Sequence, residues 1–372
     1  MRVLFISHQA NYSGAPYALL QELRHICQHC NDIHPIVLVL SGGELESDFR
    51  CLCPTIYWNN FLLKVVRKCH LERLIQKFYP IDCIYANSIV SLDVALIIKG
   101  RLQIPLIMHT HESESYLRGY VKTAGHLEEV DYFITVSELS KRCLVRKHEI
   151  RDDKVVIQRP FSPWVVKAIE ESALKPSTDK KDGDIVIGTI CNGTWQKAPE
   201  LIAIVTNFFF KRYPNANCKF MVAGIDKESD AYYHIAYDLE RMHLVDKVLF
   251  LGRVERPLEC YPLFDVFLLL SREESFSLVA EEAAICGLPI VGFEGATGAT
   301  EWIKDRCGIL VPYMDLNAMV DAIYELYSYE KRRKELGQNA RSIITKMYNE
   351  ESQMEKVINV LYSVIREKCF VR

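Results

Sequence analysis

This chain of 372 residues lacks the features that mark several common classes of protein. No apolar run approaches the roughly 18–20 residues that a helix needs to span a bilayer. Its 45 Lys and Arg residues nearly balance its 48 Asp and Glu residues, and a net charge of −3 gives no attraction to nucleic acid. The N-terminus shows no charged, apolar and small-residue pattern of a secretory signal, so we expect it to enter a strand at once.

Two further absences concern disulfides and dinucleotides. Thirteen cysteines, an odd number without a signal, favour reduced thiols in the cytoplasm over a disulfide framework. The first glycine-containing loop, SHQANYSGAPYA, is not G-x-G-x-x-G, which counts against a dinucleotide site. What is present, 49% hydrophobic and 25% charged residues, is the composition of a soluble enzyme with two sizeable cores.

Short apolar strand patterns alternate with helical patterns in both halves of the chain. In the first half we predict strands at 3–7, 35–40, 83–86, 105–109, 132–136 and 155–158, with helical patterns at 18–26 and 71–78. After a polar linker at 170–184, the prediction is strands at 185–190, 220–224, 248–252, 266–270, 289–293 and 308–312, a helix from Pro199, and helical stretches at 316–347 and 350–368. Two such runs joined by a hinge predict two doubly wound parallel-sheet domains, with a ligand site in the cleft between them.

The stretch SREESFSLVAEEAAICGLPIVG, residues 271–292, carries the strongest functional pattern. It follows a buried-type strand, and a helix is predicted to begin near Leu278 with Ser277 as its cap. The N–H groups and partial positive charge of such a helix N-terminus suit a phosphate. Glu274 and Glu282 would accept hydrogen bonds from sugar hydroxyls on either side of a bound diphosphate. The alternative is a surface acidic pair beside an ordinary strand–helix turn.

Two loops of the first half are weaker candidates. Gly14 would let a ligand approach the backbone closely, and Pro16 suits a first helical position, which leaves free amides; the alternative is a tight turn that starts a helix. His109, Thr110, His111 and Glu112 close a predicted strand, so their side chains should emerge at its carboxyl end in the cleft. The two histidines lack the helical i, i+4 spacing of a zinc site, and the alternative is a strand-end histidine satisfied by carbonyl groups.

The block from Glu274 through seven residues to Glu282, followed by CGLPIV, resembles the E-x7-E block of retaining glycosyltransferases of family GT4. Further resemblance lies, in order, in RVLFISHQANYSGAPYALLQEL, PLIMHTHE, FITVSELSK, VLFLGRVERPLECYPLFDVFLLLSRE and GILVPYMD. The match spans nearly the whole chain and is closest to bacterial-type members. It implies an α/β GT-B fold, with two doubly wound Rossmann-like domains facing across a cleft.

The resemblance also implies that the two domains bind different substrates. Residues 1–165 would form the acceptor-side domain, residues 166–350 the nucleotide-sugar-binding domain, and residues 351–372 a helix that crosses back onto the first domain. Closure about the segment 160–184 would complete the site. Each of these bounds is an expectation.

By resemblance, the reaction is transfer of a sugar from a nucleotide-diphosphate donor to a hydroxyl acceptor, with retention of configuration and without a metal or cofactor. The acceptor would be a saccharide, a lipid-linked glycan or another cell-envelope precursor, as in polysaccharide biosynthesis. His109 and Glu274 would contact the donor sugar, and Glu282 the ribose. The remaining site residues are predicted on the diphosphate (Lys197, Asn192, Ser277, Leu278) and on the acceptor or phosphate side (Gly14, Glu112, which alternatively orients His109).

One loop departs from the family pattern. CNGTWQKAPEL, residues 191–201, should carry an arginine and a lysine for the diphosphate, and only Lys197 matches. Asn192 or Gln196 stands at the arginine position, so a charge-assisted contact worth about 1.5–3 kcal/mol is missing unless Arg253 replaces it. This departure keeps a non-catalytic saccharide- or partner-binding relative open as an alternative. A sugar-nucleotide epimerase of the same architecture is another.

Three other patterns have simpler interpretations. Cys27 and Cys30, with His25 and His29, lack a second cysteine pair at finger-like spacing. Asp182 and Asp184 imitate an acidic metal motif but fall in the linker. The basic, aliphatic stretch 61–79 is either a helix with a solvated outer face or a peripheral contact with the inner face of a membrane.

Overall fold

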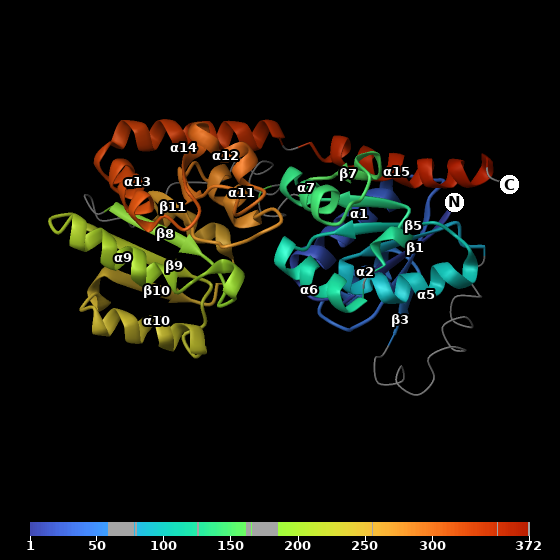
Figure 1. Cartoon of the computed structure of the whole chain (residues 1–372), viewed down its shortest axis with the longest axis horizontal. Coiled ribbons are helices and arrows are strands. Elements are labelled where there is room, and N and C mark those ends of the chain that lie inside the picture. The colour runs from blue at the N-terminus through green and yellow to red at the C-terminus, as the bar shows by residue number, and fades with distance from the viewer. Residues whose placement is uncertain are drawn as a thin grey trace. The chain divides into compact units, whose positions relative to one another are not determined.

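The computed structural model describes residues 1–58, 78, 80–124, 126–160, 165, 185–254, 256–347 and 349–370. The chain forms two compact units, Met1–Pro160 with Glu350–Arg372 and Phe161–Asn349. Each unit is a parallel sheet with helices packed on it (Figure 1). The linker 170–184 with Asp182 and Asp184, the basic stretch 61–79 apart from Phe78, and most of the segment 160–184 lie outside the described residues.

The first unit is built on a seven-stranded parallel sheet in the order β3-β2-β1-β4-β5-β6-β7. Its strands are Arg2–Ser7 (β1), His34–Val39 (β2), Thr55–Tyr57 (β3), Cys83–Asn87 (β4), Leu106–Thr110 (β5), Tyr132–Thr135 (β6) and Val155–Ile157 (β7). All six predicted strands are present, and β3 was not predicted because three residues are too few for a periodic pattern. The strand order reverses between β1 and β4, which places a switch point at their carboxyl ends.

Helices cover both faces of this sheet and complete its core. They are Gly14–His29 (α1), Glu46–Leu52 (α2), Leu92–Leu102 (α5), Glu114–Ala124 (α6), Glu138–Lys147 (α7) and Glu350–Phe370 (α15). Successive residues of β1 point to opposite faces. Val3 and Phe5 therefore join one buried cluster, while Leu4 and Ile6 join the other.

The C-terminal helix α15 belongs to the first unit through its packing. Met354, Val357, Leu361 and Val364 recur at helical spacing and are buried in the cluster that also contains residues of β1 and α1. Polar contacts fix the register: Gln353 Oε1 accepts the Arg159 N–H at 3.0 Å, and Tyr362 Oη donates to Asp32 Oδ2 at 2.6 Å. In Figure 1 this red helix lies along the blue and green elements of its unit. Segments more than 300 residues apart thus share one core.

A truncation in α15 tests this shared core. Leu361 is fully buried, so Leu361→Ala should lower the free energy of unfolding by about 2–5 kcal/mol, measured by denaturant titration. Ser363→Ala, two residues away on the exposed side of the same helix, should change it by no more than about 0.5 kcal/mol. Equal losses for the two variants would mean that α15 does not dock as described.

The second unit is a six-stranded parallel sheet in the order β10-β9-β8-β11-β12-β13. The strands are Ile185–Ile190 (β8), Cys218–Ala223 (β9), Val248–Gly252 (β10), Val266–Leu269 (β11), Ile290–Phe293 (β12) and Gly308–Val311 (β13). All six were predicted within two residues. The order reverses between β8 and β11, so a second switch point lies beyond their carboxyl ends.

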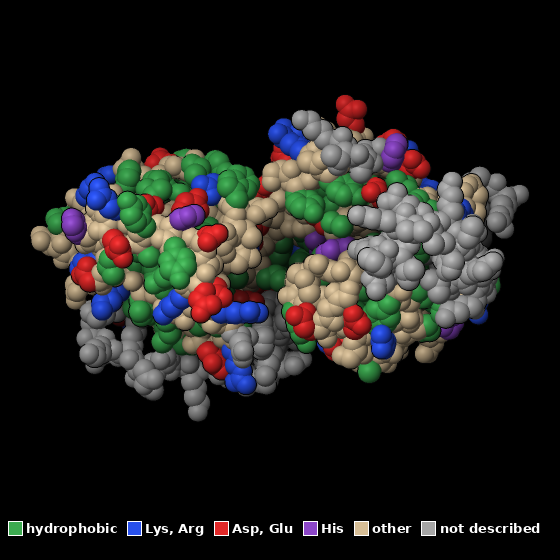
Figure 2. All heavy atoms as spheres, turned by 90° about the horizontal axis from the view of Figure 1, so that it is seen from below, with side chains coloured by type: hydrophobic (Ala, Val, Ile, Leu, Met, Phe, Trp, Pro, Cys, Tyr) green, Lys and Arg blue, Asp and Glu red, His purple; other side chains and the backbone are tan. Residues whose placement is uncertain are grey.

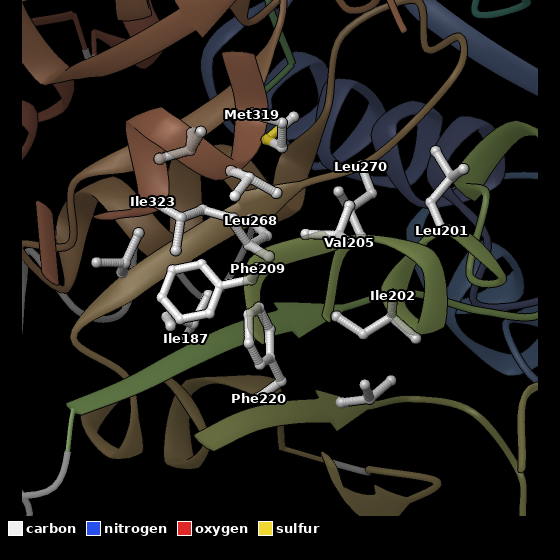
Figure 3. Close-up of a cluster of buried hydrophobic side chains, with 14 of the residues drawn as sticks. Ile187, Leu201, Ile202, Val205, Phe209, Phe220, Leu268, Leu270, Met319 and Ile323 are labelled. Atoms are coloured by element: carbon white, nitrogen blue, oxygen red, sulfur yellow. The ribbon is translucent and has the colours of Figure 1, made fainter. Parts of the chain in front are cut away.

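The helices of the second unit are Leu201–Arg212 (α9), Asp230–Arg241 (α10), Leu278–Ile285 (α11), Thr300–Cys307 (α12), Leu316–Ser328 (α13) and Glu330–Met347 (α14). The predicted single stretch at 316–347 is wrong: Tyr329, with φ −112° and ψ 86°, leaves the helical region and separates α13 from α14. Figure 3 shows one core face, where Phe209 of α9 meets Phe220 of β9 edge to face at 5.7 Å beside Ile187 and Leu268. This packing holds the strand ends in place.

Candidate functional site

The loops after β8 and β11 are clamped together at the switch point of the second unit. The carbonyl oxygen of Gln196 accepts the N–H of Arg272 at 2.7 Å. The guanidinium of Arg272 donates to the Trp195 carbonyl oxygen at 3.1 Å, lies over the Trp195 ring and pairs with Glu200. These contacts fix the backbone on which the candidate site residues stand.

Glu274 and Lys197 meet across this junction. Lys197 Nζ donates to Glu274 Oε2, and the side chains are 24% and 10% exposed. Ser271 Oγ donates to Glu274 Oε1, and Ser277 Oγ lies 3.4 Å from the same oxygen. The predicted lysine and first glutamate are therefore brought together, and each already neutralises the other. A ligand that uses Lys197 must compete with Glu274.

The N-terminus of α11 opens beside this pair. The helix begins at Leu278, as predicted, but the prediction that the Ser277 side chain caps it is wrong. Ser277 has φ +100°, and this strained backbone turns its hydroxyl toward Glu274 rather than toward the helix amides. Within the described part of the chain, the N–H groups of Leu278 and Val279 have no hydrogen-bond partner. Two free donors at a helix N-terminus suit an anion.

Glu282 lies one turn further along α11 and is 5% exposed. Its Oε2 accepts a hydrogen bond from Tyr261 Oη at 2.8 Å. Tyr261 is fully buried, and both its burial and the neighbouring Glu282 raise its pKa well above 10, so it stays a neutral donor. Sequence reasoning did not identify Tyr261, because it lies in a short turn 21 residues before its partner. A ribose contact would use the acceptor capacity that Tyr261 leaves.

In the described loops at this switch point, no unpaired arginine stands in place of the expected one. Asn192 Oδ1 accepts the N–H and hydroxyl of Thr194, at 3.2 and 2.7 Å, so it closes an Asx turn. Arg253 follows β10, the edge strand of the sheet, whereas the site lies between β8 and β11. Arg272 is the second cation of the two site loops, and its guanidinium is held by Glu200 and Trp195. The positive charge that these two loops leave available to a ligand is therefore low.

In the first unit, His109 is part of β5 and is fully buried, so the prediction that its side chain emerges beyond the strand is wrong. Tyr85 Oη lies 2.7 Å from His109 Nδ1 and donates to Glu22 Oε2 at 2.9 Å. Glu22 comes from α1 and is 2% exposed. Glu22 and Tyr85 were not identified from the sequence, since each sits in an otherwise apolar helix or strand pattern.

Burial governs the charges of this cluster. Desolvation raises the pKa of Glu22 from 4.5 to about 7, against smaller opposing effects of His111 and Tyr85. Desolvation lowers the pKa of His109 to about 3, so His109 is neutral at physiological pH. The ring of His109 lies 4.0 Å from that of His111, whose pKa is also lowered by burial.

The other first-unit candidates hold the backbone at its switch point. Glu112 accepts the N–H of Ile89 at 3.2 Å and of His111 at 2.9 Å, so it orders the main chain beside His109. Gly14 starts α1, and a side-chain carbon there would meet no atom within 4 Å. No protein contact requires glycine at that position, which leaves the space open for a ligand. Pro16 is the third helical residue, not the first.

The described residues also bear on the expectations about metal sites, thiols, surface charge and membrane-spanning helices. No group of three or more His, Cys, Asp or Glu side chains in the described ranges is arranged to hold a metal ion. The cysteines that the structure describes are free thiols. On the face that Figure 2 shows, basic and acidic side chains of the described residues lie interspersed. Among the described helices, none is both long and apolar enough to cross a bilayer.

Two doubly wound parallel-sheet units, each with a switch point in its strand order, are the architecture of the GT-B class of glycosyltransferase folds. Residues 171–343, a little under half of the chain, match the model of the family glycosyl transferases group 1. The strand orders confirm the predicted fold of two doubly wound parallel-sheet units.

Individual relatives are distant. N-acetyl-alpha-D-glucosaminyl L-malate synthase of Bacillus anthracis is 29% identical over 164 residues, which cover 44% of this chain and 42% of that protein. D-inositol 3-phosphate glycosyltransferase of Kribbella flavida is 24% identical over 286 residues, which cover 70% and 66%. The solved structure of Anabaena HepE in complex with UDP-glucose has a TM-score of 0.75 at 18% identity, covering 98% of this chain and 100% of that one. The match to the Bacillus protein thus spans less than half of its length.

The buried carboxyl of Glu22 makes stability depend on pH. Because its folded pKa of about 7 exceeds the unfolded value of 4.5, its contribution is fully present below pH 4.5 and is lost as pH rises through 7. Compared with Glu22→Gln, the native protein should therefore lose on the order of 2 kcal/mol of unfolding free energy between about pH 5 and pH 8. Denaturant titrations at both pH values measure this difference.

His109 has the opposite dependence, but it is present in both proteins and cancels in the comparison. Glu355→Gln, on the exposed side of α15, provides the baseline for removing a carboxylate. If the native protein and Glu22→Gln differ by the same amount at both pH values, Glu22 does not titrate in the folded state as described.

Proposed function

We propose that this chain is a retaining glycosyltransferase that moves a sugar from a nucleotide-diphosphate donor to a hydroxyl acceptor, without a metal. The observation that carries the proposal is the Lys197–Glu274 pair, set beside the free N–H groups of Leu278 and Val279 at the switch point. The comparisons support it, since the Kribbella relative is named a glycosyltransferase and the Anabaena neighbour was solved in complex with UDP-glucose.

The chemistry asks for charge stabilisation on a departing diphosphate more than for a protein nucleophile. Lys197 and the two N–H groups of α11 would provide it, while Glu274, released from Lys197, would accept hydrogen bonds from the donor sugar. Glu282 would bind the ribose. The proposed contacts of His109, Gly14 and Glu112 with the sugar or acceptor rest on the resemblance alone. The acceptor class remains a hydroxyl-bearing saccharide or cell-envelope precursor.

A second candidate is a saccharide-binding relative that does not turn over. It is favoured by Asn192 at the arginine position and by the pairing of Lys197 with Glu274, which together leave little cationic charge for a leaving diphosphate. The two candidates share their donor contacts and differ only in the rate of bond cleavage. Turnover therefore decides between them.

The decisive assay is release of UDP from UDP-glucose and from UDP-N-acetylglucosamine, followed by chromatography. We expect slow release without an acceptor, and the same rate in excess EDTA, because Lys197 and N–H groups take the role of a metal. Saturable binding by calorimetry without any release would favour the second candidate. Loss of release in EDTA with recovery in manganese would contradict the metal-free proposal.

The Lys197–Glu274 pair predicts opposite effects of two variants on UDP affinity. Lys197→Ala should weaken UDP binding and slow release about tenfold or more, since about 1.4 kcal/mol corresponds to each factor of ten. Glu274→Gln should strengthen UDP binding by about 1 kcal/mol, because it removes the carboxylate that competes for Lys197. The same variant should slow the release of UDP from UDP-glucose. Calorimetry with UDP and the release assay measure the two effects.

Lys219→Ala, an exposed lysine of β9 in the same unit, is the control for loss of one positive charge and should leave both quantities unchanged. If Glu274→Gln weakened UDP binding as much as Lys197→Ala, the pair would be a structural brace and not a competitor for the diphosphate.

A further inference from the structure

Three buried polar side chains of the first unit form one hydrogen-bonded chain that ends at His109. Tyr85 Oη stands between Glu22 Oε2 at 2.9 Å and His109 Nδ1 at 2.7 Å, and Glu22 Oε1 is 3.3 Å from the same Nδ1. We propose that Glu22 and Tyr85 are positioning residues that decide which ring nitrogen of His109 carries the proton. They would thereby set whether His109 Nε2 accepts or donates a hydrogen bond.

The proton count of the chain follows from the state of Glu22. When Glu22 is ionised it is only an acceptor, so the Tyr85 hydroxyl donates to it. The oxygen of Tyr85 can then only accept from His109, which must carry its proton on Nδ1. Nε2 is left with a lone pair and acts as an acceptor.

Protonation of Glu22 reverses the direction of both bonds. The carboxylic acid now donates to Tyr85 Oη, and the single proton of the Tyr85 hydroxyl turns toward His109 Nδ1. Nδ1 becomes an acceptor, so the proton of the neutral ring resides on Nε2, which becomes a donor. One proton taken up by Glu22 therefore changes the polarity of a nitrogen on another element of the fold.

Glu22 is the member of the chain that changes state near neutral pH. Its pKa is raised by burial to about 7, whereas burial keeps the pKa of Tyr85 well above 10 and lowers that of His109 to about 3. Tyr85 and His109 thus stay neutral while Glu22 titrates. The Tyr85 hydroxyl, which keeps its proton throughout, then couples the protonation of Glu22 to the tautomer of His109.

The groups that face Glu22 from neighbouring elements do not replace this coupling. From β4 and β5 they are Tyr85 and His109, and from the residue after β5, His111. His111 Nε2 contacts Asn87 Oδ1 at 2.8 Å, and its pKa is lowered by burial and by His109 and His8. On α1 itself, His25 pairs with Glu350 of α15 at 3.4 Å.

The tautomer of His109 decides what its second ring nitrogen, Nε2, can offer to a ligand. His109 Nε2 is buried and has no hydrogen-bond partner among the described residues, a situation that is destabilising unless a ligand relieves it. If the proposed function holds, that ligand is a hydroxyl of the donor sugar, which can donate to Nε2 in one state and accept from it in the other. The tautomer change itself does not depend on the reaction.

The test is nitrogen NMR of the full chain with ¹⁵N-labelled histidine, which distinguishes a protonated from an unprotonated ring nitrogen. His109→Asn assigns the signals by their loss. Between about pH 5.5 and 8.5, spanning the Glu22 pKa of about 7, the proton of His109 should move from Nε2 to Nδ1. In Glu22→Gln the signals should not change over this range. A fixed tautomer in the native protein, or the same change in Glu22→Gln, would overturn the proposal.

Two further variants separate relay from general disturbance. Tyr85→Phe deletes only the bridging hydroxyl and should abolish the tautomer change or shift its midpoint, and an unaltered transition would also overturn the proposal. Glu282→Gln alters the comparable buried glutamate–tyrosine pair of the second unit and should leave the His109 transition as in the native protein. Because the NMR readout needs no turnover, failure of the glycosyltransferase assay would leave this result unaffected.

Discussion

The reversal of strand order in each sheet is the constraint from which both candidate sites follow. In the second unit the chain runs outward from β8 in one direction and from β11 in the other, so the loops after these two strands diverge above their carboxyl ends. The hydrogen bond from the Arg272 N–H to the Gln196 carbonyl oxygen joins these two loops. Lys197 is thereby held beside Glu274 and the start of α11, although 77 residues separate Lys197 from Glu274.

Burial gives the same kinds of residue different properties in the two units. Glu274 keeps a charged partner in Lys197 and a hydroxyl in Ser271, so its carboxylate is compensated. Glu22 is faced by the neutral Tyr85 and by two desolvated histidines, His109 and His111, and burial raises its pKa. A fully buried carboxyl without a cation is costly in its charged form and favours the proton. Environment, rather than residue type, thus raises the pKa of Glu22.

Periodic patterns in the sequence were sufficient for most of the architecture. Twelve predicted strands occur where apolar runs of four to six residues indicated them, because strands buried on both faces leave a continuous hydrophobic signal. The start of α11 at Leu278, between Glu274 and Glu282, was likewise predicted from the sequence. The break at Tyr329 and the three-residue β3 were not, since local backbone geometry and neighbouring strands decide such short features.

The sequence by itself determined two parallel α/β units, the residue content of the switch-point loops and the absence of an arginine at Asn192. Only the tertiary structure decided the partners: Lys197 with Glu274, Tyr261 with Glu282, and Glu22 with Tyr85 and His109. Local sequence sets hydrophobic periodicity, whereas partners 21 to 77 residues apart meet only when strands and helices pack. The resulting burial, and not the residue types, raises the pKa of Glu22 and leaves His109 inaccessible to solvent within its strand.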